Sequence, residues 1–496
     1  MADLTHATEK RLDRGFSAEE TAIQFPPDCD QEVVGPELSW TQYASQFVIN
    51  QETGGKDFFN AAILPFSTPS TIENAEKFWR SVIFDWVRYI PFLRMIVRPK
   101  VAGQESCAED FVHVFLPADW ENIDFRVIED KERFETETED PMDLRKGPPL
   151  RVLLWATGPD REIRLVINEI NSDNAGLAVL TDAFGKITML KLGKKISAPI
   201  PPVKMCDFPK ILKDAVAARE SSDAAFWKSV VESMPKDGVK LSISAHCPAS
   251  GQYSGRIRNV SRQMTEKQVS GMVKMTEDYN STCFRIITSV YQLLLHLYTG
   301  ESVNITTNVD VTRFVPELKG VLTKLINGIS LYADFKETGG ATIKDFLQKN
   351  SSVIQQSVEH GLYPADRIQA LVEAHMTEIT RKYPKHKINQ ERVGFWSFRK
   401  QFVQKQGTNF QFKGLILNTL ETIIETQIRF YYDKRNPNNS FIVFELSQDA
   451  FSEEEAHQIK EDFFNLLDYV IDNPDGIIAD IPWDDMAQYR SSCNTK

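Results

Sequence analysis

The chain has 496 residues, of which 42% are hydrophobic and 25% are charged. This length and composition allow two or three globular domains, each large enough to bury a core of its own. The 69 acidic and 57 basic residues give a formal net charge of −12, which argues against general nucleic-acid binding because a negative surface repels a phosphate backbone.

The sequence also argues against a membrane or secreted protein. No apolar run approaches the roughly 20 residues that a membrane span requires. The first 20 residues are charged throughout and lack the apolar core of a signal peptide. The six cysteines form no Cys-x-x-Cys motif, which argues against a zinc site or a disulfide framework. We therefore expect a cytoplasmic protein with reduced thiols.

The first half of the chain shows alternating strand and helix patterns. Strands are expected at 57–66, 93–97, 112–115, 150–155 and 163–167. Helices are expected at 72–89, where apolar residues recur at helical spacing, and at 175–184. The last two strands should form a hairpin through Gly158-Pro159-Asp160.

The second half continues the same alternation after a Lys-rich and then Pro-rich stretch that predicts a linker. Helices are expected at 224–234, 266–279, 284–298, 343–359, 365–377 and 453–470. Strands are expected at 240–244, 255–260, 303–310 and 441–446. The class is therefore α/β or α+β. The predicted organisation is a leader (1–36), an N-terminal lobe (37–190), a linker (191–222) and a C-terminal lobe (223–496).

Several familiar catalytic patterns are missing from the sequence. It contains no P-loop, no Gly-x-Gly-x-x-Gly, no Gly-x-Ser-x-Gly and no His-Glu-x-x-His. The eight histidines do not cluster at the spacing of metal ligands. We therefore expect no metal site and no bound cofactor.

Polar residues are concentrated where the strand at 163–167 leads into the next helix. Asn168, Glu169, Asn171, Ser172, Asp173 and Asn174 fall within seven residues. Polar side chains between two buried elements need partners, because unpaired burial is costly. One interpretation is a structural turn, with Ser172 or Asp173 as the helix N-cap. The other is a functional site.

Short motifs elsewhere in the chain favour the functional interpretation. They are Leu38-Ser-Trp-Thr-Gln42, Pro91-Phe-Leu-Arg94, Phe226-Trp227, Arg313-Phe-Val-Pro-Glu317, Leu325-Ile-Asn327, His360-Gly-Leu-Tyr-Pro-Ala-Asp366, Phe451-Ser-Glu-Glu and Asn473-Pro474. Their order and spacing over about 450 residues resemble the condensation domains of nonribosomal peptide synthetases, which are chloramphenicol-acetyltransferase-like acyltransferases. The resemblance implies two such lobes, each a mixed sheet with flanking helices, and a tunnel between them.

The central motif of that family, His-His-x-x-x-Asp-Gly, corresponds to Asn-Glu-Ile-Asn-Ser-Asp-Asn at 168–174. Only Asp173 is retained, and Glu169 stands at the place of the catalytic histidine. The resemblance implies that Asp173 is structural and pairs with Arg94, since a buried carboxylate needs a partner. Asn174 replaces the glycine and can keep its backbone geometry.

Three hypotheses for function follow. In the first, Glu169 is the general base of an acyltransferase, and Asn168, Asn171, Ser172 and Asn174 orient substrate or hold an oxyanion. In the second, Glu169 is the acid/base of a cyclase or isomerase acting on a bulky metabolite. In the third, the protein is an inactive binding protein, in which Glu169 should form a salt bridge.

The resemblance also implies a biological context and a set of substrates and partners. It is typical of a free-standing, monomeric enzyme of microbial, particularly fungal, secondary metabolism. Such an enzyme would act on a small-molecule metabolite, with an acyl-CoA or an acyl thioester on a carrier protein in trans as co-substrate. Nucleic-acid and membrane partners are not expected.

Overall fold

The computed structural model describes residues 23–489 except 24, 44–46, 53, 56–58, 67–71, 139, 156–160, 172, 197–199, 201–202, 204–205, 236–242, 245–256, 310–314, 337, 376–390, 398–425 and 433–438. Within these residues, no helix is both long and apolar enough to cross a membrane. The chain divides into two compact units, and it passes from the first to the second between Asp214 and Ala215. The described part of Arg313–Ile326 groups with the first unit, whereas the sequence predicts contiguous lobes.

Two sheets form the frame of the first unit. One has four strands in the order β2–β7–β6–β5, and the other has three in the order β1–β4–β3. Their bounds are β1 (Val33–Glu37), β2 (Phe59–Phe66), β3 (Met95–Pro99), β4 (Phe111–Phe115), β5 (Asp124–Ile128), β6 (Leu150–Trp155) and β7 (Arg161–Asn168). All neighbours pair antiparallel except β5 and β6. Strand β1 lies partly inside the expected leader, so residues 33–36 belong to a sheet.

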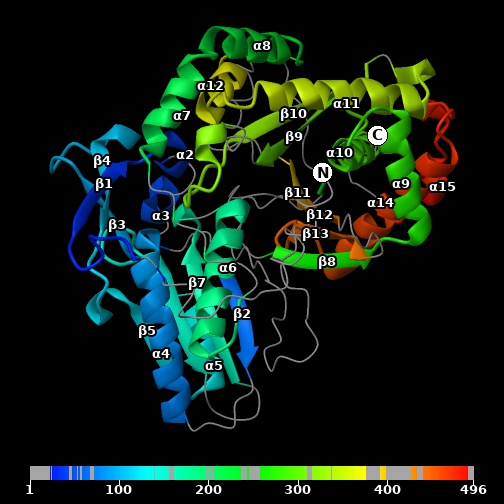
Figure 1. The fold of residues 1–496 in the computed structure, drawn as a ribbon. Helices are drawn as coiled ribbons and strands as arrows, with labels where there is room; N and C mark the ends of the chain where they lie inside the picture. The colour runs from blue at the N-terminus through cyan, green and yellow to red at the C-terminus, as the bar shows by residue number, and fades with distance from the viewer. Residues whose placement is uncertain are drawn as a thin grey trace, which may run out of the picture. The chain divides into compact units, whose positions relative to one another are not determined.

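Helices of the first unit pack on one another through aromatic side chains. They are α2 (Trp40–Gln42), α3 (Val48–Glu52), α4 (Ile72–Tyr89), α5 (Lys131–Thr138), α6 (Asn174–Lys191) and α7 (Phe208–Ala217), the last containing the boundary between the units. Helix α4 lies beside α6 (Figure 1), where Trp79 stacks on Phe184 and the indole of Trp86 donates to the carbonyl of Leu180 at 3.1 Å. These large buried side chains fix the helix that leaves the polar turn.

Two predicted elements of this unit differ from the structure. The strand expected at 93–97 begins only at Met95, because Pro91 starts a 3₁₀ turn over Pro91–Arg94. Proline suits the first position of such a turn, since it has no N–H to leave unpaired. Helix α6 continues to Lys191, seven residues beyond the expected end. The turn at 158–160 lies outside the described residues.

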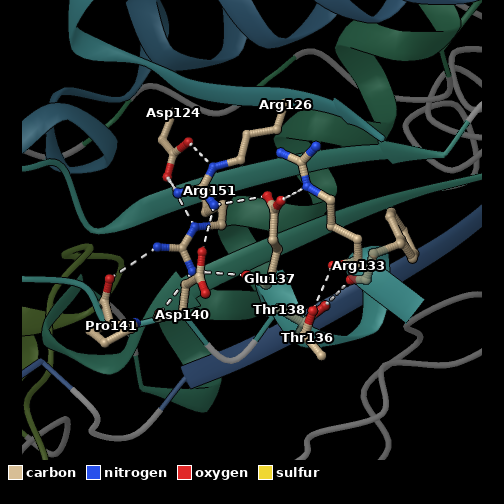
Figure 2. Close-up of polar contacts among 10 residues, drawn as sticks. Asp124, Arg126, Arg133, Thr136, Glu137, Thr138, Asp140, Pro141 and Arg151 are labelled. Carbon is tan, nitrogen blue, oxygen red and sulfur yellow. Dashed lines mark hydrogen bonds and ion pairs between the residues drawn. The ribbon is translucent and has the colours of Figure 1, made fainter. Parts of the chain in front are cut away.

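A network of charged side chains stabilises the edge strand β5 of the four-stranded sheet (Figure 2). Arg151 of β6 is 3% exposed and donates to Asp124 of β5 at 2.9 Å. It also donates to the backbone carbonyls of Glu137, Asp140 and Pro141 at 3.0, 2.8 and 3.1 Å. The guanidinium therefore ties β5, β6 and the end of α5 together.

The second unit contains one six-stranded mixed sheet, in the order β10–β9–β11–β12–β13–β8. Its strands are β8 (Ile257–Gln263), β9 (Val303–Val309), β10 (Gly328–Asp334), β11 (Glu391–Ser397), β12 (Thr426–Tyr432) and β13 (Phe441–Ser447). Strand β11 runs parallel to both neighbours, and the other pairs are antiparallel. The strand expected at 240–244 falls mostly outside the described residues.

The helices of the second unit follow the predicted pattern closely. They are α8 (Glu220–Glu232), α9 (Glu266–Asp278), α10 (Cys283–Thr299), α11 (Ile343–Glu359), α12 (Ala365–His375), α14 (Glu453–Asp472) and α15 (Trp483–Met486). The expected helix at 343–359 is confirmed at both ends, and Thr342 and Asp345 form a capping box at its start. Helix α10 is buried along most of its length, as its nearly continuous apolar sequence predicts.

Candidate functional site

The polar turn forms the end of β7 and the start of α6, as the sequence predicts. Strand β7 ends at Asn168, a 3₁₀ turn covers Glu169–Asn171, and α6 begins at Asn174. Asp173 is the N-cap of α6, and its carboxylate accepts from the backbone N–H of Gly176 at 2.9 Å. A capping aspartate satisfies one of the free N–H groups at the helix start. The N-cap predicted at Ser172 or Asp173 is therefore Asp173.

Glu169 makes an ion pair with a lysine that is distant in the sequence. The ammonium of Lys324 lies 3.1 Å from Oε2 of Glu169. The Lys324 side chain is 5% exposed and that of Glu169 is 22% exposed. The carboxylate of Glu169 is thus accessible on one side and held by a buried cation on the other.

Residues 315–326, which we call the crossing segment, bring Lys324 to the turn through backbone contacts. The N–H of Lys324 donates to the carbonyl of Ile170 at 3.2 Å. The carbonyl of Lys324 accepts from the hydroxyl of Thr41 at 3.1 Å. The next residue, Leu325, donates its N–H to Asp173 at 3.4 Å. The lysine is therefore fixed to the turn by its backbone as well as by its side chain.

The motif at 38–42 supports this arrangement. Ser39 and Gln42 form a capping box around α2. The amide nitrogen of Gln42 lies 2.7 Å from the hydroxyl of Thr323, 3.4 Å from the carbonyl of Ile170 and 3.0 Å from Nε2 of His113. The buried Gln42 thus connects the crossing segment to the turn and to β4.

His113 is a neutral histidine enclosed within the first unit. Its Nδ1 lies 2.8 Å from the carbonyl of Pro36, which can only accept, so Nδ1 carries the proton and Nε2 accepts from Gln42. Burial lowers the pKa of His113 from its ordinary value of 6.5 to about 4, although the hydrogen bond to Pro36 acts in the opposite direction. His113 is therefore part of the scaffold.

Two of the four expected substrate-orienting residues are engaged with the backbone. Asn168 is buried and its side-chain oxygen accepts from the N–H of Ile170 at 3.0 Å. Asn171 is buried and its amide nitrogen donates to the carbonyl of Phe92 at 2.6 Å. These contacts shape the turn, and a direct contact of either residue with substrate stays a prediction. Ser172 and the side chain of Asn174 lie outside what the structure describes.

Arg94 and Asp173, which the resemblance expects to pair, both make hydrogen bonds with the backbone. Arg94 donates to the carbonyl of Leu116. Asp173 accepts from the N–H groups of Gly176 and Leu325. Burial lowers the pKa of the Arg94 guanidinium. The expected pairing of the two side chains and their structural role stay predictions.

Matched motifs in the second unit are also structural. The amide nitrogen of Asn327 donates to the carbonyls of Gly361 and Tyr363, both at 2.8 Å, and its oxygen accepts from the N–H of Ala365 at 3.0 Å. Trp227 donates to the carbonyl of His360 at 2.9 Å. The ring of His360 lies 2.7 Å from the buried carboxylate of Asp223. Sequence reasoning missed Asp223, although it lies four residues before the matched Trp227.

Glu169 is the partly exposed acidic group of the turn. Within the part of the chain that the structure describes, no three His, Cys, Asp or Glu side chains are grouped to hold a metal ion. A partly exposed carboxylate can accept a proton from a nucleophile or donate one. Lys324, which sequence reasoning missed, adds a positive charge beside it.

Comparison with known proteins identifies the family. The Condensation domain family matches residues 74–488. The chain belongs to the condensation-domain family. Its described fold, with small mixed sheets and flanking helices, is that of the chloramphenicol-acetyltransferase-like condensation domains.

Individual relatives of this condensation-domain protein are remote. It is 20% identical over 377 residues to bacitracin synthase 1 of Bacillus licheniformis, covering 72% of this chain but 7% of that protein. A four-domain nonribosomal peptide synthetase, holo-AB3403 bound to AMP and glycine, superposes with a TM-score of 0.71 at 16% identity, over 91% of this chain and 34% of that one. The epimerization domain from the third module of tyrocidine synthetase B superposes with a TM-score of 0.68 at 14% identity, over 89% and 98%. The chain spans only 7% of bacitracin synthase 1 and 34% of the four-domain synthetase.

Proposed function

We propose that this protein is an acyltransferase that moves an acyl group from a CoA or carrier-protein thioester to an amine or hydroxyl of a small metabolite, with Glu169 in place of the usual histidine. The observation that carries the proposal is the position of Glu169. It directly follows the last residue of β7, and its side chain is 22% exposed while Asn168, Asn171 and Asp173 are buried. The motif resemblance supports the proposal, because it aligns Glu169 with the family's catalytic histidine.

The proposed reaction needs one proton acceptor. The nitrogen or oxygen of the acceptor attacks the thioester carbonyl, forms the new C–N or C–O bond and creates a tetrahedral oxyanion. The carboxylate of Glu169 takes the proton that the nucleophile loses. When the C–S bond breaks, the sulfur leaves with the bonding electrons and takes up this proton. Glu169 is then ionised again, and no further reactant is required.

A strain that produces the protein with Glu169→Gln tests this function. The amide cannot accept the proton, so we expect turnover to fall by about 10²-fold or more, and the unacylated precursor should accumulate. Comparison of the small-molecule extracts of the two strains by mass spectrometry measures this. Accumulation of an isomer with the mass of the final product would instead indicate the cyclase or isomerase. An unchanged extract would contradict both enzymatic hypotheses.

The matched control for this substitution is Glu109→Gln. Glu109 also pairs with a lysine of the first unit, Lys213, at 3.5 Å, but both side chains are more than half exposed. Exposed pairs contribute little to stability, and Glu109 is outside the turn at 168–174 in the sequence. The control strain should therefore produce the same metabolites as the unmodified strain.

One observation favours a second candidate function. A protein of this family that has lost catalysis is expected to hold Glu169 in a salt bridge, and Lys324 supplies such a partner. In that case the protein would bind a metabolite or a carrier protein without transforming it. Glu169→Gln would then leave the metabolites unchanged.

A further inference from the structure

Lys324 is unusual because its charged side chain is almost completely buried within the first unit. Its ammonium is 3.1 Å from Glu169, and the lysine side chain is 5% exposed. Removing a cation from water is costly unless an anion lies close to it. Glu169 supplies such an anion, and its own side chain is the more exposed of the two.

The backbone around Lys324 is also fixed, so the ammonium is held at a defined place. Its N–H and carbonyl are bound to Ile170 and Thr41, and the neighbouring Thr323 accepts from Gln42. A flexible lysine on the surface would sample many rotamers, but a lysine fixed at its backbone and buried along its stem loses that freedom on folding. The charge is thus pre-organised beside the turn.

The charge of the pair bears on the reaction. A neutral histidine in the family is replaced here by a carboxylate, which would repel the oxyanion that forms during acyl transfer. An ammonium beside that carboxylate makes the pair neutral and removes most of this repulsion. We propose that Lys324 is a positioning residue for Glu169, which orients the carboxylate and balances its charge so that a glutamate can take the place of the histidine. This inference rests on the proposed function.

The variants Lys324→Met and Lys324→Gln test this inference. Methionine keeps the length of the apolar stem and glutamine keeps a hydrogen-bond donor, but neither carries the charge. We expect kcat to fall at least 10-fold in both, with KM changed less than about 2-fold, because the interaction acts on the transition state. Lys324→Arg should restore at least part of the rate. The control Lys213→Met should retain full activity.

The measurement uses purified protein, the precursor that accumulates in the Glu169→Gln strain and a series of acyl-pantetheine thioesters as donors. The split between kcat and KM, read beside the melting temperature, separates positioning from stability. In Lys324→Met, kcat should fall while KM stays nearly unchanged, because the ammonium acts on the carboxylate in the transition state. A purely structural role would lower the melting temperature and leave the kcat of the folded protein unchanged.

The outcomes distinguish the inference from the function beneath it. If the unmodified protein transfers acyl groups and the Lys324→Met and Lys324→Gln variants do so equally well, the inference is wrong and the proposed function stands. If Lys324→Met does not fold, Lys324→Gln gives the same comparison. If the unmodified protein transfers no acyl group, the proposed function is wrong and the inference falls with it.

Discussion

At the scale of single residues, His113 makes the stability of the protein sensitive to acid. Its pKa is about 4 in the folded protein and 6.5 when exposed, so the unfolded chain binds a proton that the folded chain does not. The free energy of unfolding should therefore fall as pH decreases from 6.5 towards 4. Protonation would also place an N–H against the amide of Gln42.

This effect can be measured by guanidinium denaturation at pH 7.5 and pH 5. The unmodified protein should lose about 2 kcal/mol more than the His113→Gln variant over this interval. His457→Gln, which removes an exposed histidine, is the matched control and should behave like the unmodified protein. Equal losses in the unmodified protein and His113→Gln would show that His113 is protonated in the folded state.

The sequence predicts one member of the ion pair, Glu169, and does not predict the other, Lys324. Glu169 stands in a dense polar turn between a strand and a helix, and a resemblance to a family motif identifies its place. Lys324 lies 155 residues away and outside the motif residues. A contact over that distance leaves no local periodicity in the sequence, so only the structure reveals it.

At the scale of elements, the guanidinium of Arg151 holds the parallel edge strand β5 in place (Figure 2). It is 3% exposed and serves one carboxylate and three backbone carbonyls. Arg151→Met should lower the free energy of unfolding by about 3 kcal/mol, because it removes the donor of three backbone carbonyls and leaves Asp124 with Arg126 alone. Arg151→Lys should restore little of the lost free energy, since an ammonium cannot reproduce the planar set of N–H donors of a guanidinium.

Arg133→Met is the control for this prediction. Arg133 pairs with Glu137 in the same network, but its side chain is 65% exposed. Its loss should cost less than about 1 kcal/mol. Chemical denaturation of the three variants measures the differences. If Arg133→Met and Arg151→Met were equally destabilised, burial of Arg151 would not be the cause.

Long amphipathic helices are the elements that the sequence predicts best. Helices α4 and α11 begin and end where their apolar spacing indicates, because 17 or 18 residues give several repeats of the pattern. Strand β10 has the sequence Gly-Ile-Ser-Leu-Tyr-Ala-Asp and is not predicted, since apolar and polar residues do not alternate along it. Strand β1 is not predicted, because it contains Gly35 and Pro36, and both residue types are unfavourable in a strand.

At the scale of the whole molecule, weak motifs identify the family because their order is retained. Asn327 binds the backbone of residues 361–365, and Trp227 binds that of His360. Each of these motifs supplies a few hydrogen bonds to the backbone and is therefore short. A single motif of this length does not identify the family. The grouping of the crossing segment with the first unit could not be predicted, since it depends on contacts with residues far away in the chain.

If Glu169 is the base of an acyl transfer, its loss should slow the chemical step itself. This step is measured as the single-turnover rate of the purified protein with the accumulated precursor and acyl-pantetheine donors, by mass spectrometry of the acylated product and by release of free thiol. Product and thiol should form in equal amounts, and the rate should be at least about 10²-fold lower for Glu169→Gln. Equal rates for the two proteins, or no acylated product with any donor, would contradict this role of Glu169.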